Sequence, residues 1–534
     1  MKIQNAKWKR PALVVAALAA GAILSGPVAA SEVNLNMTKG EPFTDHHNTD
    51  LDRIIYTPLA SYRVGPYAEG GTGYYGGEID LFRWINLTYG GISGKDGDPP
   101  IPIVWDECET EWDTPRGVEC YERYKNKGPY GATANDPLSV GIAYALQEKT
   151  RADKIPSITP NHGNTASQDG RIFPYQFPVE ITPYDETSIM VQYAQQQSGG
   201  SLEGKKIAVL YHGSAYGRET IGLYNTLSEM MGFTVQQIEV PHPGNEQTSI
   251  WMRVRQFNPD FVMLRGWGVM VPVALKTAVK VGYPVSKVIG NIWSNSEGDV
   301  IPAGAAGKDY VTINTQAPGK DWPLIQRLWK DLYEGGLAGG EGDMKDTKRV
   351  GHVYYNLGVV AGIIHVEAMR AALRKFGPDM PLDGQHKRWG LENLHLDDEK
   401  LAEYGVLGMM QNVYTSCEDH TGGHRGKMAA WNGKSFDLVS KDWIVSIHHL
   451  SQTQFARCEA FADDGGLINP SWPASDSFNM LLAPQACAGL DSALISSRAA
   501  ACSSCFACCT NTRFGRNSAT QQISNGCWPA ARLS

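Results

Sequence analysis

The stretch Asn258–Tyr283, NPDFVMLRGWGVMVPVALKTAVKVGY, has the pattern of a strand, a short loop and a helix. The apolar run Phe261–Leu264 is of strand length, and Val271–Val281 repeats apolar residues at helical spacing. Between them, Arg265 and Trp267 stand beside two glycines where the strand ends. This order predicts a strand–helix unit that presents a charged and an aromatic side chain at the C-terminal end of a buried strand.

The same order of elements repeats on both sides of this stretch. Helix candidates at Thr114–Lys127, Gly217–Met231 and Ser249–Gln256 each follow or precede an apolar run. Strands that alternate with helices in this way predict an α/β fold, with parallel sheets and helices on both faces. The strand-like runs are IPIVWDE, KIPSI, KKIAVLYH, TVQQIEV, DFVMLRG and KVIGNIW.

The loops that follow the strands are the candidate functional segments, because ligands of such sheets bind outside the carboxyl ends of the strands. These loops combine small residues with hydroxyl, amide and aromatic side chains, which suit a small-molecule pocket. They read GPYAEGG, GATAND, TPNHGNTAS, HGSAYG, RGWG and NIWSNSE.

The composition indicates a sizeable globular protein that does not bind nucleic acid. The chain has 534 residues, 42% of them hydrophobic, which is enough for two or three domains. Its net charge of -8 and pI near 5.9 leave no basic surplus for contacts with phosphates.

The N-terminus has the pattern of a secretory signal peptide over residues 1–30. A basic segment that ends at Arg10 precedes the apolar run Ala12–Gly26, and Val28–Ala30 matches a cleavage site. The alternative, a membrane anchor, would need about twenty apolar residues. We therefore expect export to the periplasm, with an N-terminal extension over residues 31–49.

Export would place the cysteines in an oxidising compartment. Cys108 and Cys120 are close enough in sequence for a disulfide, the alternative being two free thiols, and Cys417 would then be left single. The other cysteines lie in residues 445–534, a Cys-, Ser- and Ala-rich tail without lysine or tyrosine. We expect this tail to be disordered or an out-of-frame reading. Its CSSCFACC motif, Cys502–Cys509, could alternatively bind a metal or an iron–sulfur cluster.

Residues 50–444 resemble the periplasmic solute-binding proteins of ATP-driven importers, specifically the branched-chain amino-acid (Leu/Ile/Val-binding) family. The resemblance rests on the order and spacing of four segments: GPYAEGGTGYYGGEIDLFRWIN, IAVLYHGSAYGRETIGLY, the stretch Asn258–Tyr283, and YNLGVVAGIIHVEAMRAAL. It implies a type I periplasmic binding fold, in which two lobes with parallel sheets are joined by three crossing strands. The first lobe would hold residues 50–182 and 317–420, and the second lobe residues 183–316 and 421–444.

The resemblance also implies a ligand site between the lobes. Thr133 and Asn135, then His162, Asn164 and Thr165, would donate to a ligand carboxylate from the first lobe. Tyr216, Trp267, Asn291 and Trp293 would contact the ligand from the second lobe, with Tyr67 nearby.

One position departs from the family pattern. Amino-acid binders of this family place an acidic residue after the strand that corresponds to KVIG, where this chain has Asn291 and Trp293. An ammonium group would then be buried without a partner, which is costly, so we expect an aromatic or related carboxylate instead. Glu297 could still reach the site and keeps a branched-chain amino acid or amide open. Arg265 is either the partner of the carboxylate or a structural residue.

The sequence offers little sign of catalysis or of a cofactor. His162 has no partner motif for a nucleophile or a base, so its enzymatic interpretation is weaker than a hydrogen-bonding one. Cys417, His420 and His424 have a spacing that could bind a metal, but the resemblance places them in a hinge loop. We expect a substrate-binding component of an ABC transporter, with permease subunits as partners and without metal or cofactor. A ligand sensor or an enzyme on the same fold is the alternative from another class.

Overall fold

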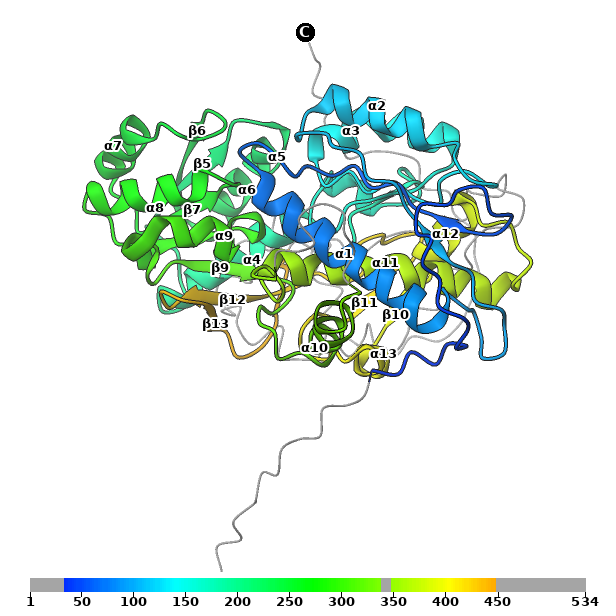
Figure 1. The fold of residues 1–534 in the computed structure, drawn as a ribbon. Helices are drawn as coiled ribbons and strands as arrows, with labels where there is room; N and C mark the ends of the chain where they lie inside the picture. Colours follow the sequence, from blue (N-terminus) through cyan, green and yellow to red (C-terminus); the bar gives the residue numbers. More distant parts are fainter. Residues whose placement is uncertain (1–32, 338–346, 448–534) are drawn as a thin grey trace, which may run out of the picture. The chain divides into compact units, whose positions relative to one another are not determined.

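The computed structural model describes residues 33–337 and 347–447, all of which belong to one compact unit of the chain (Figure 1). The predicted signal peptide and the tail from residue 448 onward lie outside the described residues. Residues 445–447 belong to the fold, since a strand at Ile444–Val445 pairs with Arg425–Gly426. The fold therefore continues past the predicted start of the tail at residue 445.

The largest sheet forms the core of one lobe, which we call the second lobe. Its order is β13-β12-β9-β8-β7-β5-β6, and β14 also pairs with β12. The strands from β5 to β9 are parallel, as predicted, whereas β12 is antiparallel to β9, β13 and β14, so the sheet is mixed. The strands are β5 (Lys206–His212), β6 (Thr234–Val240), β7 (Phe261–Arg265), β8 (Val288–Gly290), β9 (Val311–Asn314), β12 (Arg425–Trp431), β13 (Phe436–Leu438) and β14 (Ile444–Val445).

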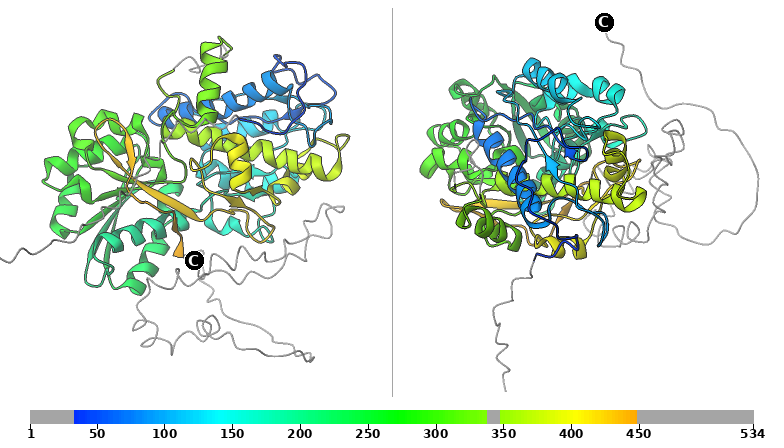
Figure 2. Two further views of the ribbon diagram at one scale, coloured as in Figure 1. Left: turned by 90° about the horizontal axis from the view of Figure 1, so that it is seen from below. Right: turned by 45° about the vertical axis from the view of Figure 1, so that its right-hand side comes forward.

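Helices cover both faces of this sheet (Figure 2, left). The predicted helix Gly217–Met231 is broken into α5 and α6. The break is at Thr220, whose backbone (φ -95°, ψ 0°) is not helical and which is the N-cap of α6. On one face α4 contacts α6, and on the other α8 contacts α7 and α9. The helices of this lobe are α4 (Pro183–Gln197), α5 (Ala215–Arg218), α6 (Ile221–Met231), α7 (Thr248–Phe257), α8 (Met270–Lys280) and α9 (Glu297–Val300).

The remaining elements form the first lobe, whose strands are shorter. β1 and β2 are parallel, β3 and β4 are parallel, and Asn135 and Asp136 bridge between the two pairs. The strands are β1 (Ile55–Tyr56), β2 (Ile103–Val104), β3 (Ser157–Ile158), β4 (Gln176–Phe177), β10 (His395–Leu396) and β11 (Val413–Tyr414). The helices are α1 (Ala68–Tyr89), α2 (Thr114–Tyr124), α3 (Val140–Asp153), α10 (Pro323–Leu328), α11 (Val353–Phe376), α12 (Gly384–Leu391) and α13 (Asp398–Tyr404).

Helices α1 and α11 pack along one another in the core of the first lobe (Figure 1). Glycines allow the close approach: a Cβ at Gly358 would lie 1.8 Å from Tyr74 O, and a Cβ at Gly77 would lie 2.0 Å from Tyr355 O. Helix α11 has the length and composition of a membrane span, yet 94% of its apolar segment is buried inside the protein. Helix α11 therefore lies in the core of the first lobe.

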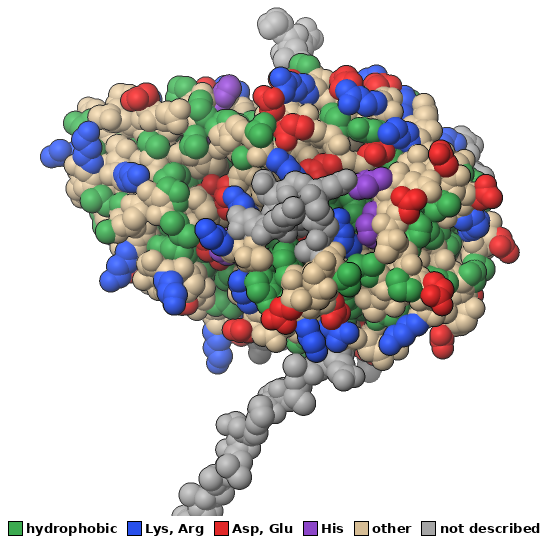
Figure 3. Space-filling view, in the orientation of Figure 1, with side chains coloured by type: hydrophobic (Ala, Val, Ile, Leu, Met, Phe, Trp, Pro, Cys, Tyr) green, Lys and Arg blue, Asp and Glu red, His purple; other side chains and the backbone are tan. Residues whose placement is uncertain are grey.

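Three chain segments pass between the lobes side by side. The Glu180 N–H donates to Thr421 O at 2.9 Å, and the His424 N–H donates to Glu180 O at 2.7 Å. The segment at the end of β9 lies beside the one that leads into β12, since Asn314 pairs with Lys427. The division of the chain into lobes at residues 182/183, 316/317 and 420/421 stays a prediction. On the face seen in Figure 3, charges of both signs are interspersed among the described residues.

Candidate functional site

A small cavity lies between the strand-end loops of the two lobes. Its volume is about 20 Å³, room for one water molecule. Of the predicted site residues, His162, Tyr216, Trp267 and Trp293 line it. The other lining residues are Trp112, Leu138, Ser139 and Val140.

Trp267 is the centre of an aromatic cluster at this cavity. Its ring is 5.2 Å from Trp293 and 6.2 Å from Tyr67, centroid to centroid, and the Tyr67 ring is nearly parallel to it. A Cβ at Gly70 of α1 would lie 2.4 Å from a ring carbon of Trp267, so the glycine makes room for the indole. The indole Nε1 is buried without a hydrogen-bond partner. Trp267 therefore joins the lobes and leaves one donor available to a ligand.

His162 adds an acceptor to the cavity lining. Its Nδ1 is 2.9 Å from Pro160 O, which can only accept, so this nitrogen carries the proton. Burial lowers the pKa of His162 to about 4, so the imidazole is neutral at pH 7. Nε2 is buried without a partner and is left as an acceptor.

Arg265 points into the second lobe and is absent from the described cavity lining. Its Nη1 is 2.5 Å from Glu186 Oε2, its Nε donates to Tyr216 O at 3.0 Å, and its guanidinium lies 4.4 Å from the centre of the Tyr216 ring. The sequence left open whether Arg265 pairs with the ligand carboxylate or has a structural role. These contacts are those of a structural residue.

The other predicted residues mostly hold the loops together. Thr133 Oγ1 donates to Tyr56 O at 3.0 Å, and the Asn135 N–H donates to Pro156 O at 2.9 Å. Asn164 caps a short 3₁₀ turn at Thr165–Gln168, and the Thr165 N–H donates to Glu219 Oε1 at 3.0 Å. These four residues support the cavity from outside its lining.

Two further predicted residues bond to side chains of the second lobe. The Tyr67 hydroxyl is 2.9 Å from His212 Nε2, so it joins the lobes beside Trp267. Asn291 Nδ2 donates to the Tyr216 hydroxyl, which in turn donates to Gly266 O at 3.0 Å. Asn291 thereby fixes the ring of Tyr216, which lines the cavity.

Sequence reasoning missed four lining residues, which come from two first-lobe segments. Cys108 and Cys120 are joined by a disulfide, with Cα atoms 5.9 Å apart. The loop that it closes carries Trp112, whose ring is 4.5 Å from that of Tyr67. Ser139 is the N-cap of α3 and accepts from the Ile142 N–H at 3.4 Å. A serine before an apolar helix pattern is an N-cap signal that could have located this segment.

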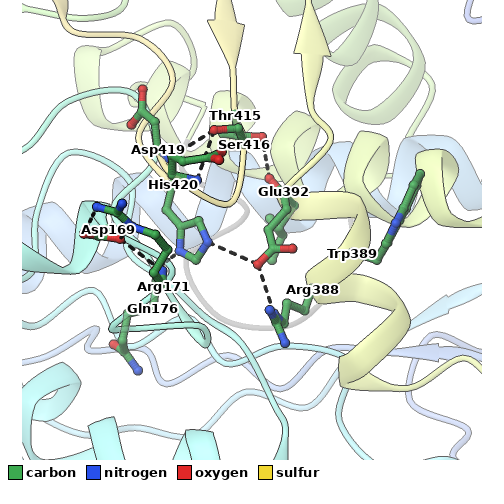
Figure 4. A network of polar contacts seen from close by, with 12 residues as sticks. Asp169, Arg171, Gln176, Arg388, Trp389, Glu392, Thr415, Ser416, Asp419 and His420 are labelled. Atoms are coloured by element: carbon green, nitrogen blue, oxygen red, sulfur yellow. Dashed lines mark hydrogen bonds and ion pairs between the residues drawn. The ribbon is translucent and has the colours of Figure 1, made fainter. Parts of the chain in front are cut away.

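The histidines of the loop Cys417–His424 bond to other residues of the protein, and Figure 4 shows the surroundings of His420. His420 Nδ1 is 2.7 Å from Gln176 O, and its Nε2 is 3.3 Å from Glu392 Oε1. His424 lies between Asp185 and Asp419, at 3.0 and 2.8 Å, and these carboxylates raise the pKa of His424 to about 10 against the effect of burial. The histidines thus have separate partners. Cys417 is disulfide-bonded, so the prediction that it is left single is wrong.

A family model described as "Periplasmic binding protein" matches residues 56–435, which is more than half of the chain. The chain belongs to the periplasmic binding protein family. The predicted membership of the periplasmic solute-binding proteins and the predicted type I fold are confirmed, whereas the specific relationship to branched-chain amino-acid binders stays a prediction. No protein among the curated ones matches this periplasmic binding protein.

Solved structures show the same fold. A crystal structure from the Pseudomonas fluorescens group, named as an ABC transporter permease, is 46% identical, with a TM-score of 0.68; the match covers 75% of this chain and 94% of that one. A branched-chain amino-acid ABC transporter protein from Thermus thermophilus with bound valine is 16% identical (TM-score 0.60, 74% and 97% coverage). A fatty-acid ABC transporter substrate-binding protein from Thermomonospora curvata is 17% identical (TM-score 0.58, 77% and 95% coverage). At 16% and 17% identity, the last two matches show only that the fold is shared.

Proposed function

We propose that this chain captures a small aromatic or otherwise apolar carboxylate in the periplasm and delivers it to the permease of an ABC transporter. The observation that carries the proposal is the composition of the cavity between the lobes. Four of its eight lining residues, Trp112, Trp267, Trp293 and Tyr216, offer large aromatic faces to a ligand. Such surfaces hold rings by stacking and edge-to-face contacts.

The start of α3 supplies a place for the carboxylate. Ser139 and Val140 line the cavity and begin this helix of 14 residues. The first N–H groups of a helix lack partners within it and carry a partial positive charge, which favours an anion. A carboxylate at this end needs no arginine, which is consistent with the pairing of Arg265 with Glu186.

The cavity offers little to an ammonium group. Its described lining holds no aspartate or glutamate, and Glu297 Oε2 already accepts from the Val353 N–H at 2.9 Å. A buried ammonium without a carboxylate partner is costly. The second candidate ligand is a branched-chain amino acid or amide. One observation favours it, since the free acceptor at His162 Nε2 could take one N–H from such a ligand.

A ligand with a ring requires the site to open. The cavity holds about one water, so the ring can enter only when the lobes separate or the indoles turn. Rotation of the lobes about the three crossing segments would expose Trp267 and Ser139 on opposite sides of the cleft. Closure on the ligand would then give the permease a surface that differs from that of the free protein.

Thermal denaturation in the presence of candidate ligands tests the proposal. Benzoate and phenylpropanoate should raise the melting temperature, because a ligand that binds only the folded state stabilises it by mass action. Leucine and valine serve as matched compounds that have a carboxylate but lack the ring, and benzamide has the ring but lacks the carboxylate. Stabilisation by leucine and valine but not by the aromatic acids would contradict the proposed ligand class.

A further inference from the structure

Three ionisable side chains meet in the core of the first lobe, away from the ligand cavity lining. Glu78 comes from α1, His365 from α11, and Asp136 from the segment between α2 and α3. One ligand atom from each lies within 4.8 Å of the other two. The three side chains are 0–1% exposed, so solvent does not screen their charges.

The polar atoms of this cluster are largely without partners. Both carboxylate oxygens of Glu78 and both ring nitrogens of His365 are buried without a hydrogen bond. Unsatisfied buried groups of this kind are rare and need an explanation, such as a bound ion. His365 Nε2 lies 3.7 Å from Glu78 Oε1 and 3.9 Å from Asp136 Oδ2. These separations are too long for hydrogen bonds, but they suit ligands of one ion at about 2.0–2.2 Å from each atom.

The neighbouring cation does not satisfy the carboxylates. Lys387 is 1% exposed, and its Nζ donates to His365 O at 2.5 Å instead of to Glu78. Burial raises the pKa of Asp136 to about 7 and that of Glu78 well above its ordinary value, and burial lowers the pKa of Lys387 to about 7. Neither oxygen of Glu78 therefore has a hydrogen-bonded cation among the described residues.

We propose that Glu78, Asp136 and His365 bind one divalent transition-metal ion of the Zn²⁺ or Mn²⁺ class. One imidazole with two carboxylates is a donor set that these ions accept. The Tyr74 hydroxyl donates to Asp136 Oδ2 at 2.7 Å and would orient this ligand. The ion would link the two core helices to the loop that leads to Leu138, because Asp136 Oδ1 accepts from the Leu138 N–H at 3.4 Å. Leu138 lines the ligand cavity, so the ion would also support that wall.

The metal content of the purified full-length chain tests the proposal. Protein produced without an affinity tag in medium with zinc and manganese should contain about one equivalent of ion, measured by mass spectrometry of the elements. Glu78→Gln should lower the content to about a tenth of an equivalent or less, since the loss of even an outer-shell partner costs about 10–100-fold in metal affinity. Glu180→Gln is the matched control, since Glu180 is also a fully buried carboxylate but bonds to Asn161 at 2.6 Å. Its metal content should equal that of the wild type.

X-ray absorption at the metal edge separates this site from the cysteines of the chain. The proposed site gives nitrogen and oxygen scatterers only, whereas sulfur scatterers would contradict it. Should Glu78→Gln fail to fold, the wild-type protein tests the proposal instead. It is unfolded in the presence of a chelator and refolded with and without Zn²⁺ or Mn²⁺. One of the two ions should raise its melting temperature above that of the metal-free protein. Folded wild-type protein that retains neither ion would overturn the proposal.

Discussion

Arg265 and Glu186 form an ion pair that is buried on both sides. Arg265 Nη1 is 2.5 Å from Glu186 Oε2, and the two side chains are 3% and 2% exposed. The other oxygen of Glu186 accepts from the Ile292 N–H at 2.6 Å. The pair therefore links the end of β7 to α4 and to the loop that carries Trp293, and so fixes two of the loops at the cavity.

Replacing Arg265 by methionine should destabilise the protein strongly. The change leaves Glu186 buried without its partner, which costs about 3–5 kcal/mol of unfolding free energy. Urea denaturation measures this loss. The double variant Arg265→Met, Glu186→Gln removes both charges and should be more stable than the single variant. An Arg265→Met protein with wild-type stability and lost ligand affinity would instead place the guanidinium on the ligand.

The sequence was sufficient to predict the elements around Arg265 but not its partner. β7 and α8 lie within a residue of their predicted bounds, because the apolar run and the helical spacing are unambiguous. Glu186 is 79 residues away in sequence, and no local pattern indicates the contact. The antiparallel direction of β12 was likewise not predictable from a local pattern, since it depends on where the chain returns from the first lobe.

The candidate site was predictable where its residues directly follow strands. Trp267 follows β7 and Trp293 follows β8, and the carboxyl ends of adjacent parallel strands lie together. Trp112 lies instead in a loop closed by the disulfide, so its position depends on tertiary contacts. The pairing of α1 with α11, which brings Glu78 to His365, joins helices far apart in the chain.

Gly70→Ala should weaken ligand binding without unfolding either lobe. The added methyl group would lie 2.4 Å from the Trp267 ring, so the indole must move or the lobes must close less fully. We expect at least about a tenfold loss of affinity, the equivalent of 1.4 kcal/mol. Calorimetric titration with the ligand found in the thermal screen measures it.

Gly222→Ala is the matched control for this variant. Gly222 lies within α6, and a Cβ there would meet only the Tyr184 hydroxyl at 3.4 Å. Alanine favours a helix over glycine by about 0.8–1.0 kcal/mol, so stability should rise slightly while affinity stays unchanged. Equal affinities for Gly70→Ala and Gly222→Ala would show that the position of Trp267 does not control binding.

Loss of the Cys108–Cys120 disulfide should reduce both stability and ligand affinity. The double change to serine opens a short loop, for which about 2–4 kcal/mol of unfolding free energy is typical. It also frees Trp112, which lines the cavity. Trp112→Ala in the oxidised protein separates the effects, since it should lower affinity with the disulfide intact. Wild-type affinity in both variants would remove this loop from the site.

Asp299 lies at the contact between the lobes. It belongs to α9 in the second lobe, and its Oδ2 accepts from the Tyr354 hydroxyl of α11 at 3.0 Å. Burial, with a smaller contribution from the Glu69 carboxylate, raises the pKa of Asp299 to about 8. The carboxyl group is therefore protonated in the folded protein at pH 7, whereas the same group in the unfolded chain is ionised.

Asp299→Asn should flatten the pH dependence of stability between about pH 4 and pH 8. Over this interval the folded state holds a proton that the unfolded chain, with an aspartate pKa near 3.8, has released. The free energy of unfolding therefore falls as pH rises, by at most about 1.4 kcal/mol per pH unit from this group, and the effect levels off above about pH 8. Asparagine keeps the shape of the side chain but cannot titrate, so the slope of the wild type minus that of the variant isolates the Asp299 contribution. Urea denaturation of both proteins at pH 5, 6, 7 and 8 measures it, and parallel curves would show that Asp299 is ionised in the folded state.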